Sequence, residues 1–282
     1  MEKAQKTQLM RFANHVRQGV VEGTFCAKAG HPGGSLSIAD TLSYLYNVEM
    51  CIDPQNPAWP QRDRLVLSKG HACPALYAAL AEKGYFDKKE LRSLRHIGAL
   101  LQGHPDMKTI PGVDMSTGSL GQGISAACGM ALSAKVSGDA YRVFAILGDG
   151  ELQEGQVWEA AMFAAHHHLD NLVAVVDNNN LQIDGEITKV CSPYPIDAKF
   201  AAFGWRVIVL DDAHDFDKID AAFAQTREPD GRPTVIVQQS VKGKGVTFME
   251  NDAGWHGKAP NKEQYEQAMT ELRAAEEKLE VE

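Results

Sequence analysis

The sequence lacks the features that mark several common classes of protein. Its 28 Lys and Arg residues are outnumbered by 37 Asp and Glu residues, which gives a formal charge of −9. This acidic balance argues against a nucleic-acid partner or an anionic membrane surface. No apolar run approaches the ~20 residues that a membrane span needs, and the charged N-terminal stretch lacks the apolar core of a signal peptide. We therefore expect a cytoplasmic protein that captures any anionic ligand locally.

Paired cysteines and linkers are also missing. The five cysteines, at positions 26, 51, 73, 128 and 191, show no C-x-x-C spacing, so neither a zinc site nor a disulfide framework is indicated. A hydrophobic content of 44% with 23% charged residues is typical of a globular protein. No repeat, low-complexity tract or Gly/Ser-rich linker divides the 282 residues, so we expect one domain over residues 1–282.

Short apolar runs predict the strands of a parallel sheet. They are β-branched or leucine-rich, end at polar or glycine residues, and occupy residues 64–68, 142–147, 171–177, 206–210 and 234–238. Helical patterns lie between and before them, at residues 38–50, 74–84, 124–136, 151–169 and 215–225. This alternation predicts an α/β fold in which an open, mainly parallel sheet carries helices on both faces.

Two further segments are assigned from composition. Residues 184–195 are predicted to form a long ordered loop. Residues 261–282 are predicted to form a charged C-terminal helix with a narrow apolar face. Packing of that helix on its own domain and docking on a partner both remain open.

An acidic turn, GDGELQEGQ at residues 148–156, follows one predicted strand, and DNNN at residues 177–180 follows the next. Because the carboxyl ends of parallel strands share one rim, we expect Asp149 and Asn179 to lie close together. The turn lacks the third glycine of a dinucleotide-binding loop, and Gln156 stands where a P-loop needs lysine. A carboxylate and an amide oxygen suit Mg²⁺ or Ca²⁺.

A metal ion would also explain an acid beside a phosphate. A phosphate charge about 4 Å from Asp149 would be repelled by roughly 4 kcal/mol at an effective dielectric near 20, and a divalent ion between them reverses the sign. The glycines and the helix N-terminus that follows could supply backbone N–H groups to phosphate oxygens. The alternative, that Asp149 and Gly150 merely turn the chain and Asn179 caps a local structure, remains open.

Several motifs, in a fixed order, resemble transketolases, which are thiamine diphosphate enzymes. The motifs are GHPGGS at 30–35, SKGHA at 68–72, GHPD at 103–106, TGSLGQG at 117–123, GDGELQEGQVWEA at 148–160, DNNNLQIDG at 177–185, KGKG at 242–245 and GWHG at 254–257. The resemblance runs from about residue 10 to residue 260. It implies the thiamine-diphosphate-binding fold, and within it the diphosphate-binding domain.

The resemblance also implies a ligand set. A Mg²⁺ ion, for which Ca²⁺ or Mn²⁺ could substitute, would be bound by Asp149, the side-chain oxygen of Asn179 and the backbone carbonyl of Leu181. The implied thiamine diphosphate site contains Gly118, Leu120, Gly148, Gly150, Glu151, Glu154, Asn179 and Ile183. Of these, Leu120 and Ile183 would pack on the cofactor. Glu154 would join a carboxylate network across a subunit contact.

Four histidines beside glycine are candidates for catalysis: His31, His71, His104 and His256. A single histidine of this kind is more often structural, but flanking glycines in loops at strand ends favour contact with a ligand. The resemblance implies that these imidazoles contact donor hydroxyls, the forming carbonyl or the aldehyde oxygen and exchange protons. The three histidines at 166–168 end a predicted helix and are interpreted as structural. The lysines of KGKG at 242–245 could reach a diphosphate or lie in a solvated loop.

The resemblance further implies what this chain does not contain. Transketolase chemistry needs a glutamate on a pyrimidine-binding domain, and both that domain and the C-terminal domain are absent from this sequence. We therefore expect the N-terminal subunit of a split transketolase, active only with a separate C-terminal subunit in an α₂β₂ assembly. It would transfer a two-carbon ketol unit from a ketose phosphate to an aldose phosphate, as in the pentose phosphate pathway.

Three other interpretations of the sequence remain open. The chain could be a non-catalytic thiamine-diphosphate-binding or regulatory protein. It could be a subunit of a related thiamine enzyme with a different ketose or a 2-oxo acid as donor. It could also be a fragment of a longer transketolase.

Overall fold

A five-stranded parallel sheet forms the centre of the computed structural model, which describes residues 1–281. The strand order is β1-β2-β3-β7-β6. The bounds are Arg64–Leu67 for β1, Val143–Gly148 for β2, Leu172–Asn178 for β3, Thr234–Gln239 for β7 and Arg206–Leu210 for β6. The predicted fold class is confirmed, and each predicted strand lies within one residue of its observed position at either end.

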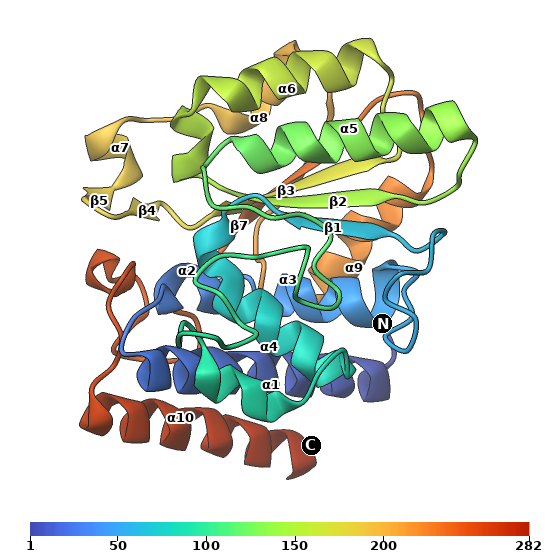
Figure 1. The fold of residues 1–282 in the computed structure, drawn as a ribbon. Helices are drawn as coiled ribbons and strands as arrows, with labels where there is room; N and C mark the ends of the chain where they lie inside the picture. Colours follow the sequence, from blue (N-terminus) through green and yellow to red (C-terminus); the bar gives the residue numbers. More distant parts are fainter. Residues whose placement is uncertain (282) are drawn as a thin grey trace.

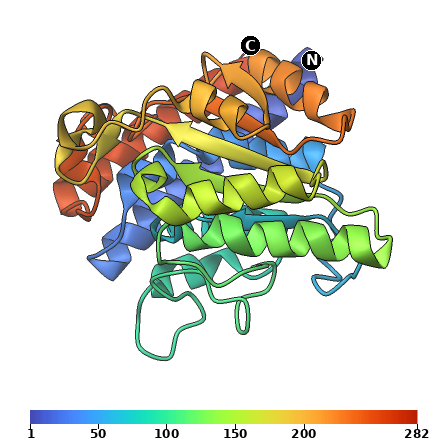
Figure 2. The same ribbon diagram turned by 90° about the horizontal axis from the view of Figure 1, so that it is seen from above.

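Helices cover both faces of the sheet (Figure 1). One face carries α5 (Gln122–Ser137), α6 (Gly155–His166) and α8 (Ile196–Ala202), and the view in Figure 2 shows α5 and α6 running across it. The other face carries α1 (Lys3–Ala27), α3 (Ala39–Tyr44), α4 (Cys73–Lys83) and α9 (Phe216–Ala224). All seven residues of β3 are buried, as expected for a central strand covered on both sides.

The strands divide the core into two layers. Phe144 and Ile146 of β2 point into the layer shared with α1, α3 and α4, whereas Val143, Ala145 and Leu147 point into the layer shared with α5 and α6. Full burial of one such large apolar side chain contributes about 2 kcal/mol. Because both faces of the strand are buried, the sequence of β2 is a continuous apolar run and not an alternating one.

Two predicted helices are interrupted in the structure. The segment predicted over 38–50 begins as α3 and continues as a single π-helical turn, Leu45–Glu49. The segment predicted over 151–169 begins as a 3₁₀ turn, Gly150–Gln153, and breaks at Glu154, whose φ of −74° and ψ of 128° are extended. The prediction of a loop at 184–195 was wrong in part. This segment contains the short strand β5 (Gly185–Glu186) and the one-turn helix α7 (Ile187–Val190), and β5 pairs with β4 (Leu181–Gln182).

The first and last helices lie side by side. The helix predicted over 261–282 is present as α10 (Lys262–Val281), with residue 282 outside the described residues, and it runs along α1 at one side of the molecule (Figure 1). Its buried residues Ala268, Met269 and Leu272 join the same core layer as α1. The structure therefore shows the apolar face of α10 packed on its own domain. Over residues 1–281, no helix has the length and apolar character that crossing a membrane requires.

His15 of α1 connects α1 to both α4 and α10. Its Nδ1 lies 2.9 Å from a carboxylate oxygen of Glu82, and its Nε2 lies 2.6 Å from one of Glu276. A neutral imidazole can donate from only one nitrogen, so both contacts are satisfied only when the ring is protonated. The hydrogen bond with Glu82 is the main cause of the raised pKa of His15.

The contribution of His15 to stability is expected to depend on pH. Since its pKa is raised, this contribution is complete below pH 6.5 and is lost as the pH rises through the folded-state pKa. For a partly exposed pair, His15→Gln should lower the free energy of unfolding by about 1 kcal/mol near pH 6, with the difference shrinking by pH 9. Urea unfolding followed by circular dichroism measures this, and the exposed His96→Gln is the control. A difference between His15→Gln and wild type that is constant from pH 6 to pH 9 would contradict the assignment.

Candidate functional site

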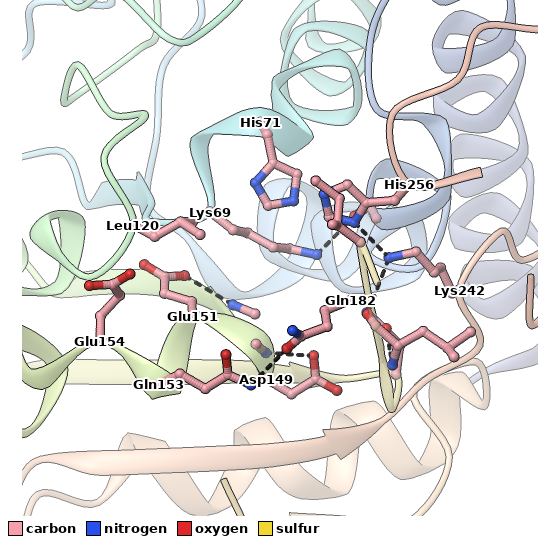
Figure 3. A pocket seen from close by; sticks show the side chains of 16 residues that line it. Lys69, His71, Leu120, Asp149, Glu151, Gln153, Glu154, Gln182, Lys242 and His256 are labelled. Atoms are coloured by element: carbon pink, nitrogen blue, oxygen red, sulfur yellow. Dashed lines mark hydrogen bonds between the residues drawn. The ribbon is translucent and has the colours of Figure 1, made fainter. Parts of the chain in front are cut away.

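A cavity of about 200 Å³ opens at the carboxyl ends of the central strands (Figure 3). Four of the strands deliver polar side chains to it: Lys69 follows β1, Asp149 follows β2, Asn179 follows β3 and Lys242 follows β7. Carboxyl ends of parallel strands are where ligands bind in open α/β sheets. The sheet therefore brings together residues that are far apart in sequence.

A buried ion pair lies beneath the cavity. Lys69 Nζ donates to Asp177 Oδ2 at 2.6 Å and to the carbonyl of Gly34 at 2.8 Å. The Asp177 carboxylate has no solvent exposure and also accepts from the hydroxyls of Ser37 and Ser240. Although burial opposes ionisation, the Lys69 ammonium and these donors lower the pKa of Asp177 to about 2. Asp177 is thus a permanent buried anion at the end of β3.

Asp149 lies next to this anion with fewer partners. Its two oxygens accept from the backbone N–H groups of Gly150, at 2.8 Å, and Asn180, at 2.6 Å. Burial, and then the negative charge of Asp177, raise the pKa of Asp149 to about 6. A buried carboxylate with a raised pKa at a cavity wall is poised to bind a cation.

The side chain of Asn179 is oriented by Asp177. Its Nδ2 donates to Asp177 Oδ2 at 2.9 Å, so that Oδ1 is the end left to accept, and the Leu181 N–H donates to that oxygen at 3.1 Å. Asp149 and Asn179 both line the cavity, as expected from their positions at strand ends, and so does Leu181, which the resemblance implied. The alternative that Asn179 only caps a local structure does not describe it fully, because this residue also lines the cavity.

The donors at this wall suit a hard cation better than a soft one. Among residues 1–281, no group of three or more His, Cys, Asp or Glu side chains is arranged to hold a metal. The wall instead offers one carboxylate, one amide oxygen and one backbone carbonyl. Mg²⁺ completes such a set with water and phosphate oxygens and does not require an all-protein cage. The residues present therefore fit Mg²⁺ bound together with a phosphate ligand, and do not fit zinc.

Lys242 settles the alternative left open for the KGKG segment. Its side chain is only 2% exposed and lines the cavity, whereas Lys244 lies outside the cavity lining and contacts Glu250. Burial and the neighbouring Lys69 lower the pKa of Lys242 to about 8. The first lysine of the segment is thus a buried cation of the site, and the solvated-loop alternative does not hold for it.

The carboxylate of Glu151 is used within the protein. It accepts from the Ser68 hydroxyl, from the Gly121 N–H at 2.9 Å and from the Gly148 N–H at 3.0 Å. Glu151 is 2% exposed, and burial is the main reason why its pKa is raised. These bonds hold the turn after β2 against the start of α5 and explain the 3₁₀ geometry that precedes α6. Glu151 also lines the cavity, and any contact with a ligand would be made there.

Three of the four predicted histidines form a triangle. The ring centroids of His31, His71 and His256 lie 5.1, 5.1 and 5.5 Å apart. Of these, His71 and His256 line the cavity, and Figure 3 shows both rings on the side opposite Asp149. Burial lowers the pKa of His31 to about 4 and of His256 to about 3, so the rings are neutral near pH 7 and each can donate and accept a proton.

His104 lies outside the triangle and is exposed. A Cβ atom added to Gly118 would lie 3.1 Å from the His104 ring, so glycine at 118 permits this close approach. Burial and then the nearby Arg95 lower the pKa of His104, and Arg95 acts in the same direction on His31. Arg95 thus places a cation beside both rings at the edge of the site.

Comparison with known proteins gives a consistent assignment. Residues 9–282 match the family model described as transketolase, thiamine diphosphate binding domain. The chain belongs to the transketolase family. It is 46% identical over 268 residues to a 6-deoxy-6-sulfo-D-fructose transketolase subunit of a Clostridium species, and covers 97% of that protein. It is 40% identical over 266 residues to an apulose-4-phosphate transketolase subunit of Phocaeicola vulgatus and covers 94% of it.

Longer transketolases match over part of their length. Human transketolase is 42% identical over 273 residues, and this chain spans 42% of the human protein. The solved transketolase structures show the same relation. A transketolase mutant from Pichia stipitis superposes with a TM-score of 0.89 at 30% identity, and the match covers 94% of this chain and 40% of the other. The Campylobacter jejuni transketolase gives a TM-score of 0.88 at 30% identity, with 96% of this chain and 45% of the other covered.

Most residues implied by the resemblance to transketolases line the cavity. All members of the implied thiamine diphosphate site do so except Gly118, which lies close to the His104 ring. The members that line the cavity are Leu120, Gly148, Gly150, Glu151, Glu154, Asn179 and Ile183. The side chain of Leu120 is partly exposed, and that of Ile183 is 64% exposed. Glu154 is exposed in this single chain, so its implied place in a network between subunits stays a prediction.

Sequence reasoning missed several residues of this transketolase-type site. Lys69 and Asp177 lie inside the motifs SKGHA and DNNN, yet neither was assigned a role. The available signal was an acid at the end of a strand buried on both faces, because such an acid requires a buried partner. Gln153 and Gln182 were also missed. Gln153 Nε2 donates to Gln182 Oε1 at 2.7 Å and so joins the turn before α6 to β4 at the cavity wall.

The two neighbouring acids should respond differently to neutralisation. Asp177→Asn leaves the Lys69 ammonium buried without its counter-charge and should lower the free energy of unfolding by about 3–5 kcal/mol. Asp149→Asn removes a charge that Asp177 repels, and Lys242 keeps Asp177 as an anion that favours its charged form, so stability should stay within about 1 kcal/mol of wild type or rise. Urea unfolding at pH 7.5 in the presence of a chelator compares the two. Equal destabilisation by both substitutions would refute this distinction.

Proposed function

We propose that this chain is the diphosphate-binding subunit of a two-subunit transketolase that uses Mg²⁺ and thiamine diphosphate. The observation that carries the proposal is the composition of the cavity. Oxygens that suit a divalent cation line the cavity, from Asp149, Asn179 and Leu181. The buried Lys242 lies against the Leu181 carbonyl, and the rings of His71 and His256 lie on the side opposite Asp149. A divalent cation and a lysine together would balance the charge of a dianionic group.

The residues of this chain would divide the cofactor's diphosphate between two kinds of charge. Asp149, Asn179 and the Leu181 carbonyl would hold Mg²⁺, which neutralises phosphate oxygens on its side. Lys242 would donate to other oxygens of the diphosphate. The apolar side chains of Leu120 and Ile183, accessible in this chain, would pack on the rings that follow the diphosphate. When bound, thiamine diphosphate supplies the electron sink for breaking and forming the carbon–carbon bond of a ketol transfer.

The histidines would handle protons at the sugar oxygens. Because the pKa values of His31 and His256 are lowered to about 4 and about 3, both rings are neutral near pH 7. A neutral ring can donate one proton to, or accept one from, a hydroxyl or carbonyl oxygen of a bound sugar. Neutral imidazoles grouped at a cavity are suited to proton transfer, which favours an enzyme over the regulatory alternative.

The substrate is proposed to be an anionic ketose. The two relatives that this chain covers almost completely are named for a sulfo-sugar and a sugar phosphate. Arg95 is the chain's own cation at the edge of the histidine group, where its charge lowers the pKa of His31 and His104. We propose a ketose phosphate or sulfonate as donor and an aldose phosphate as acceptor.

The proposal includes a partner and a place in the cell. Both relatives covered almost completely are named as transketolase subunits, and the human transketolase is more than twice as long as this chain. A separate subunit carrying the pyrimidine-binding domain would complete the site over Leu120 and Ile183, in an α₂β₂ assembly in the cytoplasm.

Reconstitution tests this proposal. The chain is mixed with the product of the gene that encodes its C-terminal partner, with Mg²⁺, thiamine diphosphate and a panel of ketose donors and aldose acceptors. Ketol transfer is expected only in the mixture, and Asp149→Asn in this chain should reduce the rate at least about 100-fold, because a metal-ligand charge is lost. Gln225→Glu, an exposed change at the end of α9 away from the site, serves as the control. No ketol transfer by a mixture of two folded chains that form a complex would contradict the proposal.

A further inference from the structure

Lys242 contacts a proposed ligand of the metal directly. Its Nζ donates to the Leu181 carbonyl at 3.3 Å and lies 3.2 Å from His256 Nδ1. Figure 3 shows the Lys242 ammonium beside the His256 ring. The carbonyl that would ligate Mg²⁺ is thus already in contact with a protein cation.

Among the described residues, no side-chain cation forms an ion pair with Asp149. Its neighbour Asp177 is paired with Lys69 at 2.6 Å, whereas the hydrogen bonds to Asp149 come from two backbone N–H groups. Lys242 and Asp149 stabilise each other's charged forms across the cavity. With Asp149 2% exposed, water cannot replace this counter-charge effectively.

The backbone that carries Lys242 is held in place, so a change of partner by its ammonium would come from rotation of the side chain. The Val241 N–H donates to His214 Nε2 at 3.0 Å, and Arg17 Nε donates to the Lys244 carbonyl at 3.1 Å. Gly243, with φ of +79°, packs so tightly that an added Cβ would lie 2.2 Å from the Met249 carbonyl oxygen. A flexible four-carbon stem on a rigid turn lets the ammonium change partners without a change in the fold.

We propose that Lys242 is a resident cation of the metal site, which Mg²⁺ must displace from Leu181 and which the incoming diphosphate accepts. This inference rests on the proposed function, because it concerns the same metal and diphosphate. A divalent ion bound to Asp149 and to the Leu181 carbonyl would repel an ammonium held at that carbonyl. A diphosphate removes the repulsion, since it draws Lys242 toward its own oxygens.

The consequence is a coupling between the two ligands through one side chain. Metal alone binds weakly because Lys242 occupies its place, and diphosphate alone binds weakly because Asp149 repels it. Each ligand then raises the affinity of the other, and this coupling is reciprocal. The arrangement keeps the acidic wall in position before either ligand arrives.

The test is the affinity for metal in the absence of any phosphate. Free Mn²⁺ is measured by electron paramagnetic resonance during titration of the full chain. Lys242→Met should bind Mn²⁺ about tenfold more tightly than wild type, because the competing cation is gone. In calorimetry with saturating Mg²⁺, the same variant should bind inorganic pyrophosphate about tenfold more weakly, because a charged donor is gone. A single substitution is thus expected to change two affinities in opposite directions.

Matched variants separate charge from packing. Lys242→Arg keeps the charge and should keep the weak affinity for Mn²⁺ of wild type. Lys244→Met makes the same chemical change two residues along the same turn, outside the cavity, and should change neither affinity. Should Lys242→Met fail to fold by circular dichroism, Lys242→Gln retains a donor toward Leu181 without the charge and gives the same readout.

The outcomes distinguish this inference from the proposed function. Mn²⁺ binding to folded Lys242→Met or Lys242→Gln that is no tighter than to wild type, while Mg²⁺–pyrophosphate binding persists, would overturn the resident-cation role and leave the proposed function intact. Wild-type chain that binds neither Mn²⁺ nor Mg²⁺–pyrophosphate would overturn both.

Discussion

The Asp177 carboxylate, buried at the end of β3, accepts hydrogen bonds from the side chains of Lys69, Ser37, Ser240 and Asn179. Those partners come from the segment after β1, the turn before α3, the end of β7 and the residue just beyond β3 itself. A buried ion pair contributes little net stability against an apolar replacement, but removing either partner is costly. Its value here is geometric, because it fixes the ends of three parallel strands and the turn that follows α2 (Pro32–Leu36) relative to one another.

The functional geometry follows from that fixed centre. Asn179 presents its amide oxygen because its Nδ2 is held by Asp177, and Gly34 approaches the cavity because Lys69 holds its carbonyl. The negative charge of Asp177 also contributes to the raised pKa of Asp149, whose charge the proposed metal would neutralise. His71 and His256 line the side of the cavity opposite Asp149. The positions of the polar groups at this site and their charges are therefore linked through Asp177.

Features of the fold and of the site could be predicted from the sequence where they depend on local contacts, and not where they depend on contacts between distant residues. The strands were found because burial on both faces leaves continuous apolar runs such as VFAIL and NLVAVV. Asp149 and Asn179 were paired correctly because strand ends share a rim.

The break at Glu154 could not be predicted, since it arises when the Glu151 carboxylate turns back to accept from the Gly148 and Gly121 N–H groups. For Lys242 the sequence left a diphosphate contact and a solvated loop both open, because the turn that carries it is held by His214 and Arg17, which lie far away in sequence. The 25-residue helix α1 was overlooked because its charged N-terminal turn obscures the apolar positions that begin at Leu9.

The most direct test of the central claim is the position of the metal. Crystals of this chain grown with Mn²⁺ and thiamine diphosphate, with diffraction recorded at the manganese absorption edge, give that position without reference to activity. We expect one strong anomalous peak within ligand distance of Asp149, the Asn179 amide oxygen and the Leu181 carbonyl, with the diphosphate adjoining it. A peak at any other set of residues, or a diphosphate bound with no metal beside Asp149, would contradict this expectation.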